Sequence, residues 1–131
     1  MARMSVEELL AEARARIPRF RPHEAQEALG RGAILVDIRT DAQRTADGQV
    51  PDAHVVERNV LEWRLDPAAE YRDPDLARRD VPVIVMCDAG CQSSLAAATL
   101  RRLGLDAGDL AGGFQAWLEA GLPVTRQPPR P

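Results

Sequence analysis

The sequence contains no lysine, so its 17 basic residues are all arginines. This absence excludes reactions that need a lysine side chain, such as Schiff-base formation, attachment of a cofactor to lysine, and phosphate binding by a P-loop lysine. The formal net charge of -3 argues against a general nucleic-acid-binding protein, because such proteins usually present a basic face. We therefore expect no nucleic-acid partner.

Aromatic residues and long apolar runs are also scarce. Aromatics make up 4% of the chain, so a core has to be built mainly from Leu, Val, Ile and Ala. Glutamates and arginines interrupt residues 1–17 every few positions, which argues against both a membrane span and the apolar centre of a signal peptide there. We expect a cytoplasmic protein with no membrane partner, and its 131 residues suit one domain with its own core.

Cysteine and histidine are few. The two cysteines are Cys87 and Cys91, and the two histidines, His23 and His54, lie far from them in the sequence. This spacing matches no recognised zinc motif, and a structural disulfide is not expected in a reducing compartment. We therefore expect no metal and no organic cofactor, and the cysteines favour a reactive thiol.

Apolar runs that alternate with helical patterns predict an α/β fold with a parallel sheet. The predicted strands cover residues 33–38, 55–56, 81–86 and 107–111. The predicted helices cover residues 6–17, 23–29, 59–65, 93–103 and 114–120. The polar stretch after the first strand is expected to be a charged loop. Residues 66–80 are expected to form a surface loop with one helical turn at 75–79.

Cys87 follows the apolar run 81–86 and precedes a polar loop that leads into an alanine-rich helix. The first N–H groups of a helix lack intrahelical partners and carry partial positive charge, so an anion is favoured there. A cysteine in this place is favoured as a thiolate, which is the nucleophilic form of the side chain. On this evidence alone, Cys87 could equally be a small buried residue that ends a core strand.

Several segments together resemble a single-domain rhodanese-like protein, from about residue 19 to residue 124. The matching segments are Val36-Asp37-Ile38-Arg39, Gly48 to Ala53, the Cys-x-x-Gly loop at Cys87, Gly112-Gly113-Phe114 with Trp117, and Gly121 to Val124. The resemblance implies a rhodanese-like α/β fold, a five-stranded parallel sheet with helices on both faces. It divides the chain into an N-terminal helical extension (1–17), the rhodanese-like domain (18–125) and a proline-rich tail (126–131), which we expect to be poorly ordered.

The resemblance also implies a sulfurtransferase whose catalytic residue is Cys87. The thiolate would take the outer sulfur of a small donor such as thiosulfate and hold it as a persulfide. The persulfide would then pass its sulfur to a thiol or cyanide acceptor, or to an acceptor protein. A covalent intermediate of this kind gives ping-pong kinetics.

The loop after the cysteine is expected to cradle the sulfur, and a neighbouring strand end to support the loop. The cradle consists of Asp88, Ala89, Gly90, Cys91, Gln92 and Ser93. Its backbone N–H groups can converge on the sulfur, with Gly90 in a conformation that other residues resist. Asp37 and Arg39 are expected to position the loop through hydrogen bonds. Ser93 and Ser94 either cap the helix or donate hydroxyl hydrogen bonds to the site.

The loop departs from the family pattern at several positions. Gln92 stands where many active rhodaneses have an arginine, so we expect weaker binding of the thiosulfate dianion. Asp88 adds negative charge beside the nucleophile and opposes an anionic donor. Cys91 is either an outward free thiol or a partner for Cys87 in a reversible disulfide.

Other functions stay open at this point. A noncatalytic binding or regulatory module would keep the fold without turnover; Gln92 favours this alternative, whereas Cys87 and Gly90 argue against it. A thiol redox protein would use Cys87 together with Cys91. Phosphatases of the same fold have a cysteine, five residues and then an arginine, and here that last position is Ser93, which argues against phosphatase activity.

Overall fold

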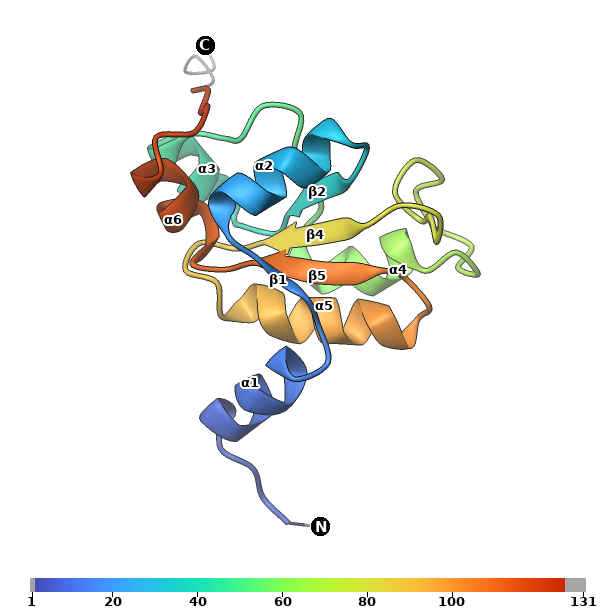
Figure 1. The fold of residues 1–131 in the computed structure, drawn as a ribbon. Coiled ribbons are helices and arrows are strands. Elements are labelled where there is room, and N and C mark those ends of the chain that lie inside the picture. Colours follow the sequence, from blue (N-terminus) through green and yellow to red (C-terminus); the bar gives the residue numbers. More distant parts are fainter. Residues whose placement is uncertain (1, 127–131) are drawn as a thin grey trace.

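The computed structural model describes residues 2–126, so most of the predicted proline-rich tail lies outside the described residues. The helices are α1 (Val6–Arg14), α2 (Pro22–Gly30), α3 (Asp41–Asp47), the 3-10 helix η1 (Arg58–Val60), α4 (Leu61–Leu65), α5 (Gln92–Arg102) and α6 (Gly113–Glu119). The strands are β1 (Arg19–Phe20), β2 (Ile34–Asp37), β3 (His54–Val55), β4 (Val83–Met86) and β5 (Ala107–Leu110). Figure 1 shows their arrangement.

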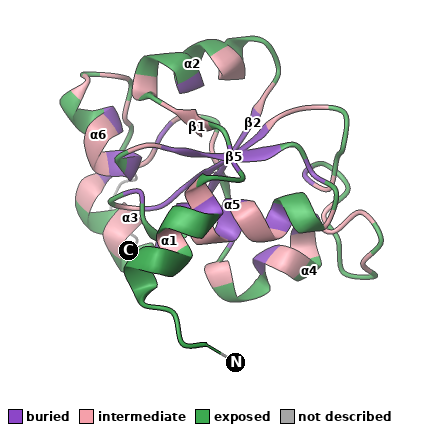
Figure 2. Cartoon of the chain, turned by 60° about the horizontal axis from the view of Figure 1, so that its bottom comes forward, coloured by how far each residue is buried: buried purple, intermediate pink, exposed green. Residues whose placement is uncertain are grey.

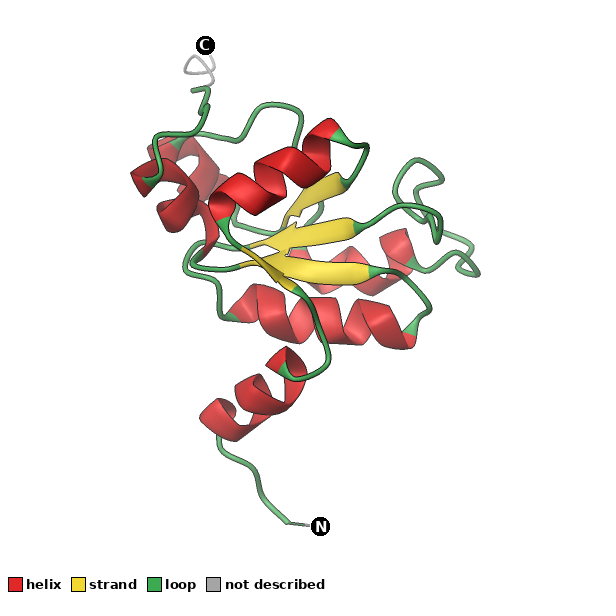
Figure 3. Cartoon of the chain, viewed as in Figure 1, coloured by secondary structure: helices red, strands yellow, loops and turns green. Residues whose placement is uncertain are grey.

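The strands form one five-stranded parallel sheet in the order β1-β5-β4-β2-β3, which confirms the predicted fold class. β4 lies in the middle, between β5 and β2, and helices cover both faces of the sheet (Figure 3). From β2 the chain continues to β3 at one edge, whereas from β4 it continues to β5 on the opposite side. Open α/β sheets bind ligands where the connections diverge in this way, at the carboxyl ends of the strands.

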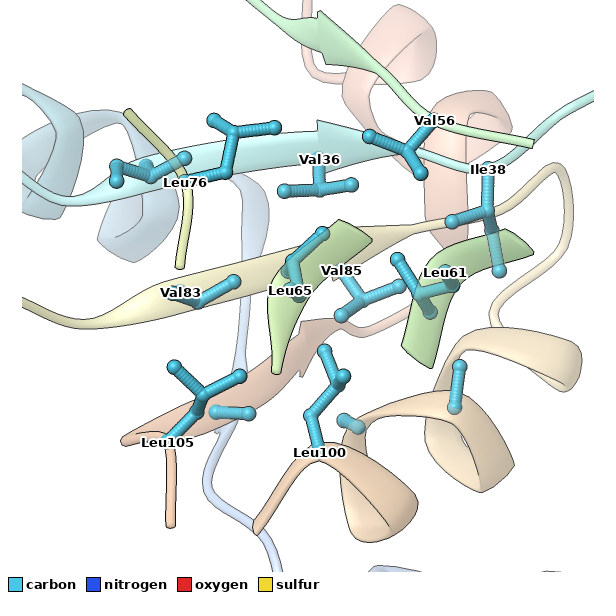
Figure 4. Packing of buried hydrophobic residues seen from close by; sticks show 14 of the residues in the cluster. Val36, Ile38, Val56, Leu61, Leu65, Leu76, Val83, Val85, Leu100 and Leu105 are labelled. Carbon is cyan, nitrogen blue, oxygen red and sulfur yellow. The ribbon is translucent and has the colours of Figure 1, made fainter. Parts of the chain in front are cut away.

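Side chains along β4 alternate between two apolar cores. Val83 and Val85 belong to one core, and Ile84 and Met86 belong to the other. Cys87 continues the alternation and lies on the same side as Val83 and Val85. Leucines from α4 and α5 close this side, as Figure 4 shows: Leu61, Leu65 and Leu100. The strand pattern therefore directs the Cys87 side chain toward α5.

The second core lies on the opposite face of the sheet, beneath α2 and α6. It includes Ala25 of α2 together with Phe114 and Trp117 of α6, all of which are buried. Trp117 is therefore a core residue. α1 lies outside these layers and contacts α5 (Figure 1). Among residues 2–126, every helix is too short or too polar to cross a membrane.

The charged stretch after β2 forms α3 instead of the predicted loop. Its capping box was the overlooked signal: the Thr40 hydroxyl accepts the Gln43 N–H at 3.1 Å, and the Gln43 side chain accepts the Thr40 N–H at 3.0 Å. The two-residue strand β1 was also missed, because so short a segment has no detectable periodicity.

A single helical turn occurs at residues 73–77 instead of the predicted 75–79, because the Asp73 carbonyl accepts the Ala77 N–H at 2.8 Å. The described structure has turns and bends there. The Asp73 carboxylate also accepts the Asp75 N–H at 3.0 Å, a local hydrogen bond at the start of this turn.

Candidate active site

Cys87 lies between the end of β4 and the beginning of α5, as the sequence predicts. Its Sγ accepts hydrogen bonds from the backbone N–H groups of Gly90 at 3.1 Å and Ser93 at 3.3 Å. The Ser93 hydroxyl oxygen is 3.3 Å from the same sulfur. The side chain is only 5% exposed, so these contacts dominate its surroundings. Converging N–H groups at a helix N-terminus favour a negatively charged sulfur.

Gly90 gives the loop its shape. Its φ of +86° lies in the region that favours glycine, and a Cβ there would stand 2.6 Å from the backbone nitrogen of Gly112. The loop is therefore packed directly on the beginning of α6. Phe114 of α6 secures the same contact, because its N–H donates to the Cys87 carbonyl at 2.8 Å.

A buried carboxylate, Asp109 of β5, supports the loop from the sheet. Its Oδ2 accepts the hydroxyl groups of Ser93 at 2.8 Å and Ser94 at 2.7 Å, and its Oδ1 accepts Nε of Arg19 at 2.9 Å. Of the two roles expected for these serines, capping of α5 is not observed: the N-cap residue is Cys91, and within the described residues its side chain makes no capping hydrogen bond. The serines follow the cap and turn toward β5.

Asp37, the last residue of β2, forms a fully buried ion pair with Arg39. Nη2 of Arg39 lies 2.9 Å from the Asp37 carboxylate and donates to the Gly48 carbonyl at 2.9 Å. The guanidinium also stacks on the Phe114 ring, 3.9 Å from its centroid. These hydrogen bonds link Asp37 to Arg39 and Arg39 to Gly48. Arg39 reaches the Cys87 loop by stacking on Phe114, whose N–H donates to the Cys87 carbonyl. Within residues 2–126, Nη1 of Arg39 is buried without a hydrogen-bond partner.

A surface hollow of about 230 Å³ opens beside the sulfur. Its lining consists of Arg39, Gln43, Cys87, Asp88, Ala89, Cys91 and Gln92. A neighbouring hollow of about 380 Å³ shares Arg39 and Gln92 with it and extends toward Arg58. The two hollows adjoin at the carboxyl ends of β2 and β4, where the sheet topology predicts a ligand site.

The structure brings the remaining predicted cradle residues to this hollow. The Asp88 carboxylate accepts Nε2 of Gln115 at 3.0 Å, which ties it to α6. Ala89 and Gln92 are exposed, and Cys91 is an exposed free thiol. Gln92 thus presents an uncharged amide at the rim of the hollow.

Comparisons with known proteins identify the family. The Rhodanese-like domain family matches residues 21–120. The thiosulfate sulfurtransferase GlpE of Pseudomonas fluorescens is 39% identical over 101 residues, which cover 76% of this chain and 83% of that protein. A sulfurtransferase from Allochromatium vinosum is 34% identical over 92 residues, covering 70% of this chain and 77% of its own. The chain therefore belongs to the rhodanese-like domain family, as its motifs predict.

Solved structures agree with this assignment. A protein of unknown function from Rhodopseudomonas palustris, described as a possible tyrosine phosphatase, has a TM-score of 0.86 and 29% identity, covering 95% of this chain and 97% of that chain. A thiosulfate sulfurtransferase from Pseudomonas aeruginosa has a TM-score of 0.66 and 25% identity, covering 85% of this chain and 20% of its own.

Sequence reasoning missed three residues that hold the loop: Asp109, Arg14 and Arg19. Arg14 and Arg19 lie before the family match, which begins at residue 21. Asp109 lies in a strand with few β-branched residues, where one acidic side chain gives no pattern. The available signal was the acidic residue inside a predicted strand, because a carboxylate that becomes buried there needs polar partners nearby.

Proposed function

We propose that this protein is a sulfurtransferase that carries a transferable sulfur as a persulfide on Cys87. The proposal rests on the surroundings of Cys87. Its Sγ accepts hydrogen bonds from the Gly90 and Ser93 N–H groups, and the residue also lines the 230 Å³ hollow, where a substrate could bind. Relatives named thiosulfate sulfurtransferase support the same chemistry. The N–H groups stabilise negative charge on the sulfur through both halves of the reaction.

In the first half, the Cys87 thiolate attacks the outer sulfur of thiosulfate. The bond between the two thiosulfate sulfurs breaks, its electron pair leaves with sulfite, and the outer sulfur stays bound to Cys87. In the second half, cyanide or a thiolate attacks that outer sulfur. The bond to Cys87 breaks, thiocyanate or a new persulfide leaves, and the Cys87 thiolate is restored.

The hollow offers the thiosulfate dianion little positive charge. Gln92 is neutral, Asp88 is acidic, and Arg39 already pairs with Asp37 at 2.9 Å. We therefore propose that thiosulfate binds weakly and that a less charged sulfur donor suits the site better. Gln92→Arg should lower the KM for thiosulfate by about tenfold, the effect of one charge-assisted hydrogen bond. An unchanged KM in this variant would contradict the proposed cause.

Steady-state kinetics with thiosulfate and cyanide test the proposal. We expect the wild-type protein to form thiocyanate with the parallel double-reciprocal lines of a ping-pong reaction. Cys87→Ser should form none, whereas His23→Ala, an exposed change on α2, should match the wild type. A folded wild-type protein that forms no thiocyanate would instead favour a noncatalytic binding module.

The same assay series separates two other activities. Ser93 occupies the position where related phosphatases have their arginine, so para-nitrophenyl phosphate should not be hydrolysed. For a redox function, mild oxidation of the wild type should remove two hydrogens from the intact mass as a Cys87–Cys91 disulfide forms. The disulfide hypothesis fails if Cys91→Ser shows the same mass loss.

A further inference from the structure

The N-terminal helix α1 reaches the Cys87 loop through its last residue, Arg14. Nη2 of Arg14 donates to the Gly90 carbonyl at 2.9 Å, and Nε donates to the Ser94 hydroxyl oxygen at 3.1 Å. Nη2 also lies 4.0 Å from Sγ of Cys91. α1 precedes the residues that match the family, so these contacts come from the part of the chain that the family pattern does not cover.

The contacts converge on the residue that positions the sulfur. Gly90 donates its N–H to Sγ of Cys87 at 3.1 Å, while its carbonyl accepts Arg14 and Arg19, each at 2.9 Å. The Ser94 hydroxyl oxygen lies 3.3 Å from this carbonyl, but its hydrogen goes to Asp109 at the shorter distance of 2.7 Å. The N–H and carbonyl groups flank a single Cα, so a guanidinium that holds the carbonyl restricts the backbone rotations that set the direction of the N–H.

Arg14 is a substantial part of the attachment of α1. Most of the helix surface is exposed in Figure 2, and Ala13 is the only residue of α1 that is buried within the described structure. The helix has its own capping box, Ser5 with Glu8, so its formation does not depend on Arg14. The hydrogen bonds of Arg14 therefore join α1 to the loop and are not needed to form the helix.

We propose that Arg14 is a positioning residue for Cys87, which makes α1 part of the active-site architecture. Its guanidinium holds the Gly90 carbonyl so that the Gly90 N–H points at the sulfur, and its positive charge favours the thiolate. The positive charge of Arg14 lies behind the loop, whereas Gln92 supplies none at the rim and Arg19 is already paired with Asp109 at 2.9 Å. The inference deepens the proposed function but can be measured on the thiol itself, without any sulfur transfer.

The test is the pH profile of Cys87 alkylation by iodoacetamide, followed by intact mass on a Cys91→Ser background so that Cys87 is the sole thiol. Arg14→Gln should slow alkylation at neutral pH by about three- to tenfold and move the midpoint of the profile to higher pH. The rate at high pH should equal or slightly exceed that of the parent, because a thiolate that is less stabilised is a somewhat stronger nucleophile. Arg14→Lys, which keeps the charge and one donor, should fall between the two.

Arg16→Gln is the matched control, because Arg16 is exposed just after α1 and makes no hydrogen bond to the loop among the described contacts. Thermal unfolding of each variant identifies a temperature at which all are folded for the alkylation measurement. A profile for Arg14→Gln that matches its parent overturns the proposal. So does an equal slowing by Arg16→Gln, which would indicate a general charge effect. If sulfur transfer fails while Arg14→Gln still shifts the profile, only the proposed function is lost.

Discussion

Asp109→Asn tests whether the buried carboxylate anchors the Cys87 loop. The carboxylate accepts two serine hydroxyl groups and the Arg19 guanidinium, at distances between 2.7 and 3.2 Å. An asparagine of the same shape retains one acceptor oxygen, but its NH2 group cannot accept, so at least one of these donors loses its partner. Hydrogen bonds to a charged group contribute about 1.5–3 kcal/mol each.

We therefore expect Asp109→Asn to lower the free energy of unfolding by about 2–4 kcal/mol. Urea unfolding followed by tryptophan fluorescence measures this, because Trp117 is buried and donates to the Pro123 carbonyl at 2.9 Å. Asp106→Asn is the control: Asp106 pairs with Arg101 at the surface, and its loss should cost less than about 1 kcal/mol. Equal effects of the two variants would refute the anchoring role of Asp109.

Three further substitutions probe the loop, α3 and the core. Gly90→Ala should destabilise the protein by about 1–3 kcal/mol and slow Cys87 alkylation, because the new Cβ meets the Gly112 backbone; an unchanged alkylation rate would contradict this. Thr40→Ala removes the N-cap of α3 and should cost about 1 kcal/mol in urea unfolding. Leu100→Ala should cost about 2–5 kcal/mol by opening a cavity beneath the sheet, and a smaller loss would show that α5 can collapse into it.

The central strands and the long helices of this fold could be predicted because their patterns are strong and local. The run 33–38 predicted β2, and 81–86 predicted β4, each to within about two residues. β1 could not be predicted from local sequence, because its two residues form a strand only by pairing with β5, a segment far away in the sequence. Pairing partners of this kind follow from the tertiary fold and not from local propensity.

The position of the proposed nucleophile was also predictable, whereas the contacts that support its loop were not. Cys87 and Gly90 stand in a recognisable motif between a strand and a helix, and the structure brings the predicted cradle together around one hollow. Arg14 and Asp109 belong to no recognisable sequence motif, because each contacts residues that are distant in the sequence. Arg14 bonds to a residue 76 positions away, and Asp109 to residues at least 15 positions away. Their roles depend on how α1 and β5 pack against the loop.

The central claim is that Cys87 carries the transferred sulfur, and intact-protein mass after treatment with a large excess of thiosulfate, which offsets its weak binding, tests it most directly. The account predicts that the wild-type protein gains one sulfur atom, that cyanide removes it, and that Cys87→Ser gains none. A wild-type protein that keeps its original mass would contradict the account. A sulfur retained by Cys87→Ser would contradict it equally, since the carrier would then be another residue.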